Sequence, residues 1–107
     1  IECALEASAQ APLAVARACA DLLETLVTVG RIGTKHALTD VATAAYLAEA
    51  ALRGAALFVT VNASLMRAHE RGNELARAAA QIRERGQAAL AACLEAIEQR
   101  QPALATR

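Results

Sequence analysis

Apolar residues recur at three- and four-residue steps along most of the chain, which is the spacing of one face of an α-helix. The longest example is residues 74–100, where charged residues fall between the apolar positions and Pro102 follows the pattern. We therefore expect an amphipathic helix that ends just before this proline. Its predicted buried seam consists of Leu75, Ala79, Ile82, Gly86, Ala89, Cys93 and Ala96.

The N-terminal part of the chain predicts two helices. Residues 1–10 suit a short helix, and Pro12 then restarts the chain at a first-turn position, where a missing N–H costs no helix bond. Residues 13–29 carry a second amphipathic pattern. Gly30 follows, and because glycine is typical of helix C-termini, we expect the second helix to end there.

A long third helix is expected after a polar loop at residues 31–38. Thr39 offers a hydroxyl for an N-cap, and Asp40 places a carboxylate in the first turn, where the positive end of the helix dipole favours it. The pattern runs to residue 68, and the polar residues 69–73 predict the next bend. No alternation with a period of two appears, so the sequence predicts an all-α, antiparallel helical bundle.

The long helix is apolar on nearly every side, which indicates a central position in the bundle. Only Glu49 and Arg53 are charged in its middle, and their spacing predicts an ion pair along the helix. One face carries small side chains that let backbones approach closely, within the fold or across a dimer interface. We expect this face to be buried in a homodimer or larger assembly; its members are Ala44, Ala48, Ala51 and Ala55.

Composition narrows the class of protein. Alanine accounts for 30 of the 107 residues, and Tyr46 and Phe58 are the only aromatic residues, so the core must be thin. Eleven basic residues balance eleven acidic ones, which disfavours binding to nucleic acid or to an anionic membrane. The longest uncharged apolar stretch, residues 54–66, is shorter than a membrane-spanning helix requires.

The cysteines and histidines favour a cytoplasmic chain without a metal. The three cysteines are odd in number and far apart, and each is expected to be a small buried residue in a reducing compartment. His36 and His69 fall in different bends without carboxylates at ligand spacing, so no metal site is expected. The chain begins with isoleucine in a segment that already has a helical pattern, which favours a piece of a longer protein.

Two stretches of the chain resemble a known family. In residues 2–13 a helix leads into an Ala-Pro-Leu step, and in residues 38–63 Thr39-Asp40 opens an Ala-rich helix that reaches an Ala-Ala-Leu-Phe-Val-Thr-Val-Asn run. In order and spacing, residues 1–96 resemble the cyclodeaminase/cyclohydrolase family. That family includes the cyclodeaminase domain of formiminotransferase-cyclodeaminase and the methenyltetrahydrofolate cyclohydrolases.

The resemblance implies a site for the one-carbon unit of tetrahydrofolate. Asp40 falls on the family's aspartate, which implies a catalytic carboxylate that stabilises positive charge at the one-carbon atom or relays a proton. Asn62 falls on the second asparagine of the family's Asn-Val-x-x-Asn step, which implies an amide that orients the pterin or a water. A tetrahydrofolate derivative would be the substrate, with no permanently bound cofactor. The other substrate-binding positions are Thr39 beside the aspartate and, for the anionic polyglutamate end, Lys35, Arg31 or Arg53.

The chain departs from the family pattern at two points. Phe58 stands where the family has its first asparagine, so an aromatic ring replaces an amide. The family's Gly-rich segment, Pro-Gly-Gly-Gly-Ser in its usual form, belongs to an N-terminal half and does not occur here. Residues 1–107 are therefore expected to be the C-terminal portion of one helical domain, completed by that half, by a dimer partner, or by both.

Each candidate residue also has a purely structural interpretation. Asp40 suits any helix start, and Asn62 suits a hydrogen bond to a neighbouring helix. Arg53 has a partner in Glu49 on its own helix. The remaining alternatives are solvated loop charges for Lys35 and Arg31 and a core position for Phe58. The second hypothesis is therefore a non-catalytic helical dimerisation module that kept the fold.

Overall fold

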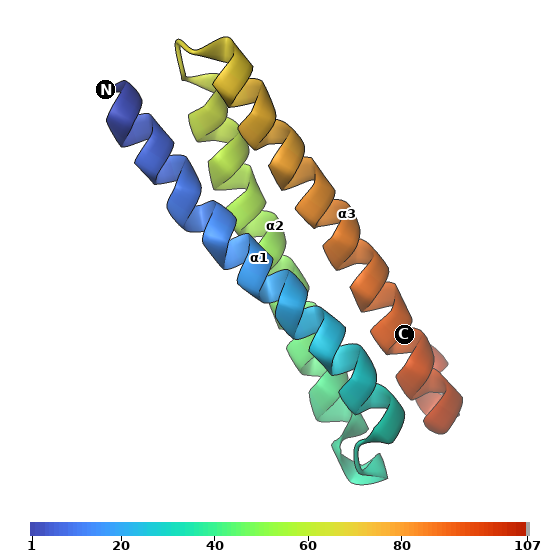
Figure 1. The fold of residues 1–107 in the computed structure, drawn as a ribbon. Helices are drawn as coiled ribbons and strands as arrows, with labels where there is room; N and C mark the ends of the chain where they lie inside the picture. Colours follow the sequence, from blue (N-terminus) through green and yellow to red (C-terminus); the bar gives the residue numbers. More distant parts are fainter. Residues whose placement is uncertain (107) are drawn as a thin grey trace.

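Three long helices run antiparallel to their neighbours along the chain and form one elongated bundle (Figure 1). The computed structural model describes residues 1–106, in which α1 spans Glu2–Ile32, α2 spans Leu38–Ser64 and α3 spans His69–Arg100. The short 3-10 turns η1 and η2 cover Lys35–Ala37 and Pro102–Thr106. Helical segments cover 92% of the chain, and no strand occurs in the described part, which confirms the predicted all-α bundle.

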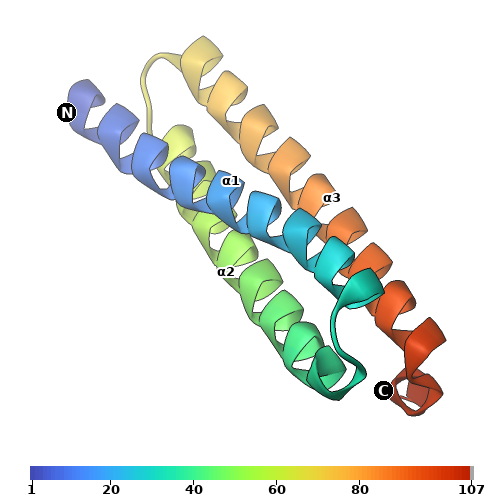
Figure 2. The same cartoon turned by 60° about the horizontal axis from the view of Figure 1, so that its bottom comes forward.

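The bundle is a rod of 50 × 18 × 17 Å in which each helix packs against both others (Figure 2). The prediction for α3 is confirmed along its full seam, since all seven named positions are buried. The largest fully buried side chains include Leu23 from α1, Leu52 from α2 and Ile97 from α3. Alanines fill ten of the 23 core positions, so the helices approach closely and the core is thin.

The predicted break near Pro12 is wrong, because Pro12 lies inside a continuous α1. A proline in a helix interior removes one bond, here the bond to the carbonyl of Ser8, four residues earlier. That carbonyl accepts a hydrogen bond from Asn62 Nδ2 of α2 at 3.0 Å instead. The helix therefore continues past the proline without an unpaired carbonyl at this turn.

The predicted cap at Gly30 is also wrong, since α1 continues to Ile32 and Gly33 is its C-cap. Gly30 is needed for close approach: a Cβ there would lie 3.1 Å from Cγ2 of Ile97. Arg100 of α3 closes this end of α1 by donating to the carbonyl of Gly30 at 2.9 Å and to that of Gly33 at 2.6 Å. A basic residue near the last carbonyls of a helix is favourable there.

Helix α2 begins two residues earlier than expected. Ala37 is its N-cap, without a side-chain hydrogen bond, so the prediction of Thr39 as N-cap is wrong. Thr39 lies within the first turn, where its carbonyl accepts the hydroxyl of Thr43 at 3.0 Å. Asp40 is the acidic residue of that turn, as predicted.

The second bend lies at residues 65–68, so the expected bend at residues 69–73 is wrong. His69 already belongs to α3. Glu2 explains the early start, because its carboxylate accepts the backbone N–H of Arg67 at 2.7 Å and that of Ala68 at 3.3 Å. A carboxylate at a helix N-terminus pairs N–H groups that have no partner within the helix.

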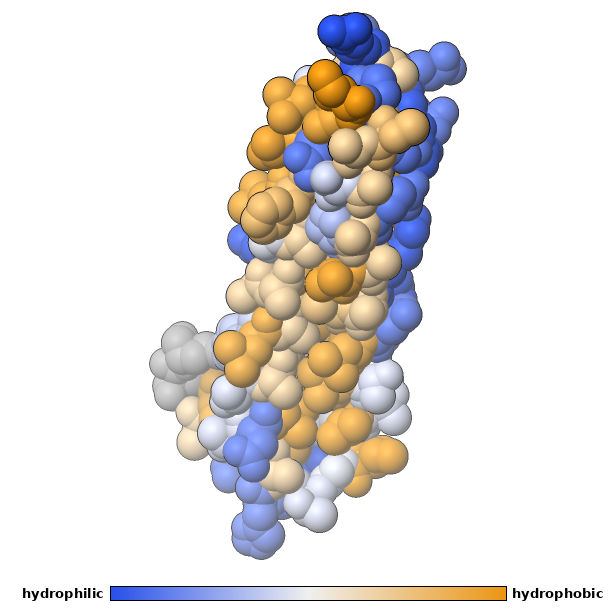
Figure 3. All heavy atoms as spheres, turned by 90° about the vertical axis from the view of Figure 1, so that its left-hand side faces the viewer, coloured by the Kyte–Doolittle hydropathy of each residue, from blue (hydrophilic) through white to orange (hydrophobic). Residues whose placement is uncertain are grey.

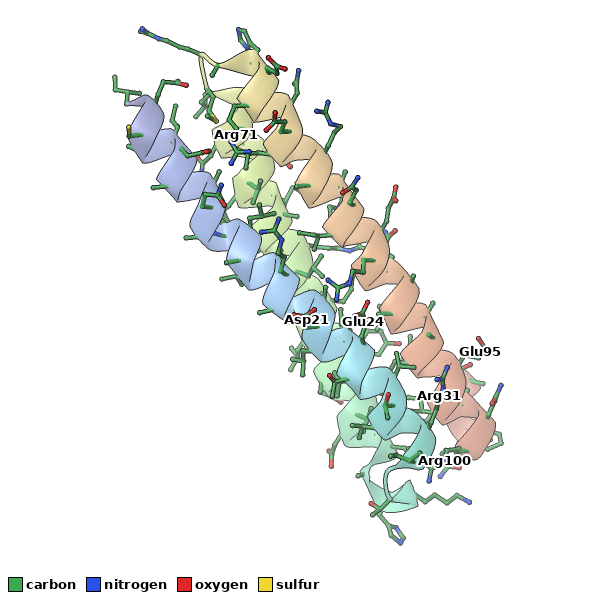
Figure 4. The ribbon with its side chains drawn as sticks, in the orientation of Figure 1. Asp21, Glu24, Arg31, Arg71, Glu95 and Arg100 are labelled. Carbon is green, nitrogen blue, oxygen red and sulfur yellow. The ribbon has the colours of Figure 1, made fainter. Side chains whose placement is uncertain are left out.

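Ion pairs join α1 to α3 along one edge of the rod, where Asp21, Glu24 and Arg71 are labelled in Figure 4. Arg85 donates from Nη2 to Asp21 Oδ1 at 2.6 Å and from Nε to Glu24 Oε2 at 2.7 Å. The Arg85 guanidinium lowers the pKa of Glu24. Nearer the chain's start, Arg71 bridges Glu6 and Glu74. The polar side of the bundle is therefore the side where α1 meets α3.

The three cysteines occupy different environments. Cys93 is fully buried, and burial raises the pKa of its thiol. Cys19 is half-buried, whereas Cys3 is exposed, so the prediction that each cysteine is buried is wrong for Cys3. All three are free thiols.

Candidate functional site

Asp40 lies at the end of the bundle where α1 turns into α2. It is exposed in the first turn of α2, and Thr39 and Lys35 of η1 lie exposed beside it in sequence. A carboxylate and an ammonium near a helix N-terminus can hold charge of either sign on a ligand. Three of the residues selected from the sequence therefore share one end of the molecule.

A cavity of about 200 Å³ opens next to this end, between α2, α3 and η2. Its lining combines hydroxyls with apolar side chains and one carboxylate. Consecutive helix residues point about 100° apart, so Asp40 points away from the side on which Thr39 lines the cavity. The lining residues are Thr39, Ala42, Thr43, Tyr46, Leu94, Ile97, Glu98 and Leu104.

Asn62 lies at the opposite end of α2. It is 22 residues beyond Asp40 on the same helix, a separation of about 33 Å at 1.5 Å per residue. One amide hydrogen of Asn62 is already donated to the Ser8 carbonyl. The fold of a single chain therefore does not bring Asp40 and Asn62 to the same ligand atom.

Arg53 lies between them, and its guanidinium pairs with the carboxylate of Glu49. The predicted ion pair along the helix is thus confirmed. Glu49 is buried while Arg53 is half-exposed, so the ion pair links a carboxylate in the core to a guanidinium at the surface of α2. No selected residue of the first turn reaches this position, because Arg53 is 13 residues from Asp40.

A second cavity, of about 340 Å³, lies between the ends of α1 and α3, where Arg31, Glu95 and Arg100 are labelled in Figure 4. Arg31 and Arg100 line it together with Glu95 and Gln99. Sequence reasoning selected Arg31 but missed the α3 residues. The available signal was the basic residue in the last turn of α3, which commonly interacts with free helix carbonyls.

A continuous uncharged face covers the side where α1 meets α2 (Figure 3). Phe58 belongs to it and is 66% exposed, so the interpretation of Phe58 as a core residue is wrong. The alanine face expected at a dimer interface lies only partly at the surface. Ala48 and Ala55 are buried in the chain's own bundle, whereas Ala51 is exposed. The large exposed apolar side chains here are Val15, Leu22 and Val29 of α1 and Leu47, Phe58, Val61 and Leu65 of α2.

The segment Lys35–Ser64 is long and apolar enough to cross a membrane by length and composition, with a mean hydropathy of 1.4 in its most apolar window. The expectation that every apolar stretch is too short is wrong by this measure. The same composition is typical of a core helix, and α2 packs one side against both α1 and α3. The Glu49–Arg53 pair lies at its centre, where a bilayer would disfavour charge.

A family model described as formiminotransferase-cyclodeaminase matches residues 1–81. The match covers α1, α2 and the first part of α3, and it includes every residue selected as catalytic or substrate-binding. No curated protein and no solved structure gives a match. In the part of the chain that the structure describes, the His, Cys, Asp and Glu side chains form no group of three suited to a metal ion.

Proposed function

The chain belongs to the formiminotransferase-cyclodeaminase family, and from this premise we propose that its protein acts on the one-carbon unit of a tetrahydrofolate derivative. Two reactions fit the resemblance: closure of formiminotetrahydrofolate to the methenyl form with loss of ammonia, and hydration of the methenyl form to formyltetrahydrofolate. The observation that carries the proposal is the family match over residues 1–81. Both reactions require proton transfer at a cationic, amidine-like carbon.

In this proposal Asp40 is the catalytic group. An exposed carboxylate on a helix first turn is free to approach a bound ligand and to stabilise developing positive charge. Thr39 offers a hydroxyl to the same ligand, and Lys35 offers a cation to its polyglutamate end. The substrate is bound only for turnover, and the proposal includes no permanently held cofactor or metal.

Within one chain, neither Asn62 nor Arg53 belongs to the proposed site at Asp40. The length of α2 separates Asn62 from Asp40 by about 33 Å within one chain. If Asn62 contacts the substrate of Asp40, a second chain must supply it. Arg53 contacts a ligand only if its ion pair with Glu49 is shared or broken.

We propose further that the bundle is a cytoplasmic portion of a larger helical assembly, in which the α1/α2 face is covered. The exposed apolar side chains of this face support the proposal, because monomers rarely leave a large continuous apolar patch in water. The proposed partner is a second copy of the chain, packed through the Ala-rich helices α1 and α2. The proposed domain is the C-terminal portion of a cyclodeaminase-type helical domain.

The decisive experiment offers each substrate separately to the intact protein. Release of ammonia from formiminotetrahydrofolate would identify a cyclodeaminase, and formation of formyltetrahydrofolate without ammonia would identify a cyclohydrolase. We expect residues 1–107 alone to show no turnover above background, because their described part gathers no second catalytic group around Asp40. An intact protein that neither binds nor converts a folate would instead support the non-catalytic dimerisation module.

Phe58 is the residue on which the two hypotheses differ most. It replaces an amide of the family pattern with an exposed ring. A ring at this point favours contact with another apolar surface, whereas an amide favours contact with a polar ligand. Turnover gained by the Phe58→Asn variant would indicate that the natural chain has drifted from the family's chemistry.

A further inference from the structure

Two residues of the family-like stretches, Pro12 and Asn62, meet through one backbone carbonyl. Pro12 has no N–H, so the carbonyl of Ser8 loses the donor that it would have in an unbroken helix. Asn62 Nδ2 lies 3.0 Å from that oxygen and donates to it from α2. The two residues are 50 positions apart in sequence and lie on different helices.

This turn of α1 differs chemically from the turns around it. Inside a helix a carbonyl normally accepts the N–H four residues later, and a side chain from a neighbouring helix can then use only its second lone pair. The proline removes the backbone donor at one position and also crowds the Ser8 carbonyl away from its usual direction. The Asn62 amide therefore has a specific partner here that a one-turn shift of α1 would remove.

A specific partner matters here because alanine occupies about half of the buried positions of α1 and α2. These positions include Ala9, Ala16 and Ala20 on α1 and Ala45, Ala56 and Ala63 on α2. Small, similar side chains at regular steps pack almost equally well after a slide of one or two turns. A polar residue at one position of a helix interface is a known way to select one register among near-equivalent ones.

We infer that Pro12 and Asn62 form a register clamp: the proline opens one carbonyl of α1, and the asparagine of α2 fills it, which fixes how far the two helices slide. Fixing the slide also aligns the α1 and α2 parts of the uncharged face. The inference goes beyond the proposed function and does not rest on it. It assigns Asn62 a role between helices in place of contact with a substrate.

The first test is a double-mutant cycle in the 107-residue chain. Asn62→Ala should raise the unfolding equilibrium constant about threefold to tenfold, because it removes a hydrogen bond between α1 and α2 at a solvent-accessible position. In a Pro12→Ala background the same change should cost less than about twofold, because the backbone N–H restored at position 12 then donates to the Ser8 carbonyl. Asn73→Ala, at an exposed position of α3, is the matched control for loss of an amide. Equal costs of Asn62→Ala in the two backgrounds would overturn the clamp.

The second test reports the register directly. A nitroxide on the exposed native Cys3, in a Cys19→Ala background, broadens the amide resonances of the residues of α2 nearest to it. We expect Asn62→Ala to add a second broadened region displaced by about 3.5 or 7 residues, the steps at which a helix surface repeats. An unchanged profile would overturn the register role.

A third measurement remains informative if Asn62→Ala fails to fold. The side-chain amide protons of Asn62 are recorded in the natural chain and in Pro12→Ala, which keeps the asparagine. One of them should lie downfield in the natural chain and move toward the position of a solvated amide in Pro12→Ala. Identical shifts in the two proteins would show that Asn62 does not depend on the proline, and would overturn the clamp.

Discussion

Asp40 combines two features that a substitution can separate, a charge at a helix N-terminus and a carboxylate available to a ligand. Asp40→Asn should lower the turnover of the intact protein by about 100-fold or more, because it removes a group that acts on the reacting carbon. The control is Glu70→Gln, which removes the first-turn carboxylate of α3. Both variants should lose a similar, small amount of stability. Equal turnover in the two variants would leave Asp40 with a helix-start role only.

Glu2 makes the stability of the bend before α3 depend on pH. Hydrogen bonds from the backbone of Arg67 and Ala68 hold the pKa of Glu2 below its ordinary value. Its stabilising effect is therefore complete above the unfolded-state pKa of about 4.3, and it is lost as the pH falls through the lower native pKa. Glu2→Gln should lower the urea midpoint at about pH 7, and this loss should shrink as the pH falls through the lowered native pKa of Glu2.

The comparison for Glu2 is Glu84→Gln, which removes an exposed carboxylate from the middle of α3. A general effect of net charge would change both variants in the same way at each pH. A midpoint for Glu2→Gln that matches the natural chain at about pH 7 would contradict a contribution from the Glu2 contacts.

At the scale of the helices, two glycines should respond oppositely to alanine. A Cβ on Gly54 meets no atom within 4 Å, so Gly54→Ala should stabilise α2 by about 0.5–1 kcal/mol. A Cβ on Gly72 would lie 2.7 Å from the backbone oxygen of Ala63, so α2 and α3 would have to move apart. We expect Gly72→Ala to destabilise by about 1–3 kcal/mol. Urea unfolding measures both, and a shared sign would contradict the helix contact at Gly72.

The helices themselves were largely predictable, because a period of 3.6 is a local property. The seam of α3 needed only the spacing of Leu75, Ile82 and their neighbours. The predicted helix boundaries are wrong where a residue distant in the sequence determines the local structure. Asn62 donates to the carbonyl that Pro12 leaves without a backbone donor, and Glu2 accepts backbone N–H groups just before α3. Sequence periodicity cannot identify such partners.

At the scale of the whole molecule, the candidate site was predictable only in part. Lys35, Thr39 and Asp40 are neighbours in sequence, so their common location followed from the chain itself. The family pattern places Asn62 in the same site as these residues, but α2 separates Asn62 from Asp40 by about 33 Å. The cavity between Arg31 and Arg100 depends on the packing of α1 against α3, which the basic residue in the last turn of α3 does not specify by itself.

For the whole molecule, a charge introduced at Phe58 tests the proposed homo-oligomer. Phe58 is exposed and contributes little to the core of its own chain, so Phe58→Glu should leave the helix content unchanged. In a two-fold interface the new charge would be buried twice, once from each chain, at a cost of several kcal/mol. We therefore expect Phe58→Glu to weaken self-association of the 107-residue chain by at least about 100-fold, measured by sedimentation over a range of concentrations.

Gln87→Glu adds the same charge at an exposed position of α3 and should leave association unchanged. A natural chain that remains a folded monomer at high concentration would contradict the oligomer, and equal weakening by both variants would point to net charge instead of the α1/α2 face.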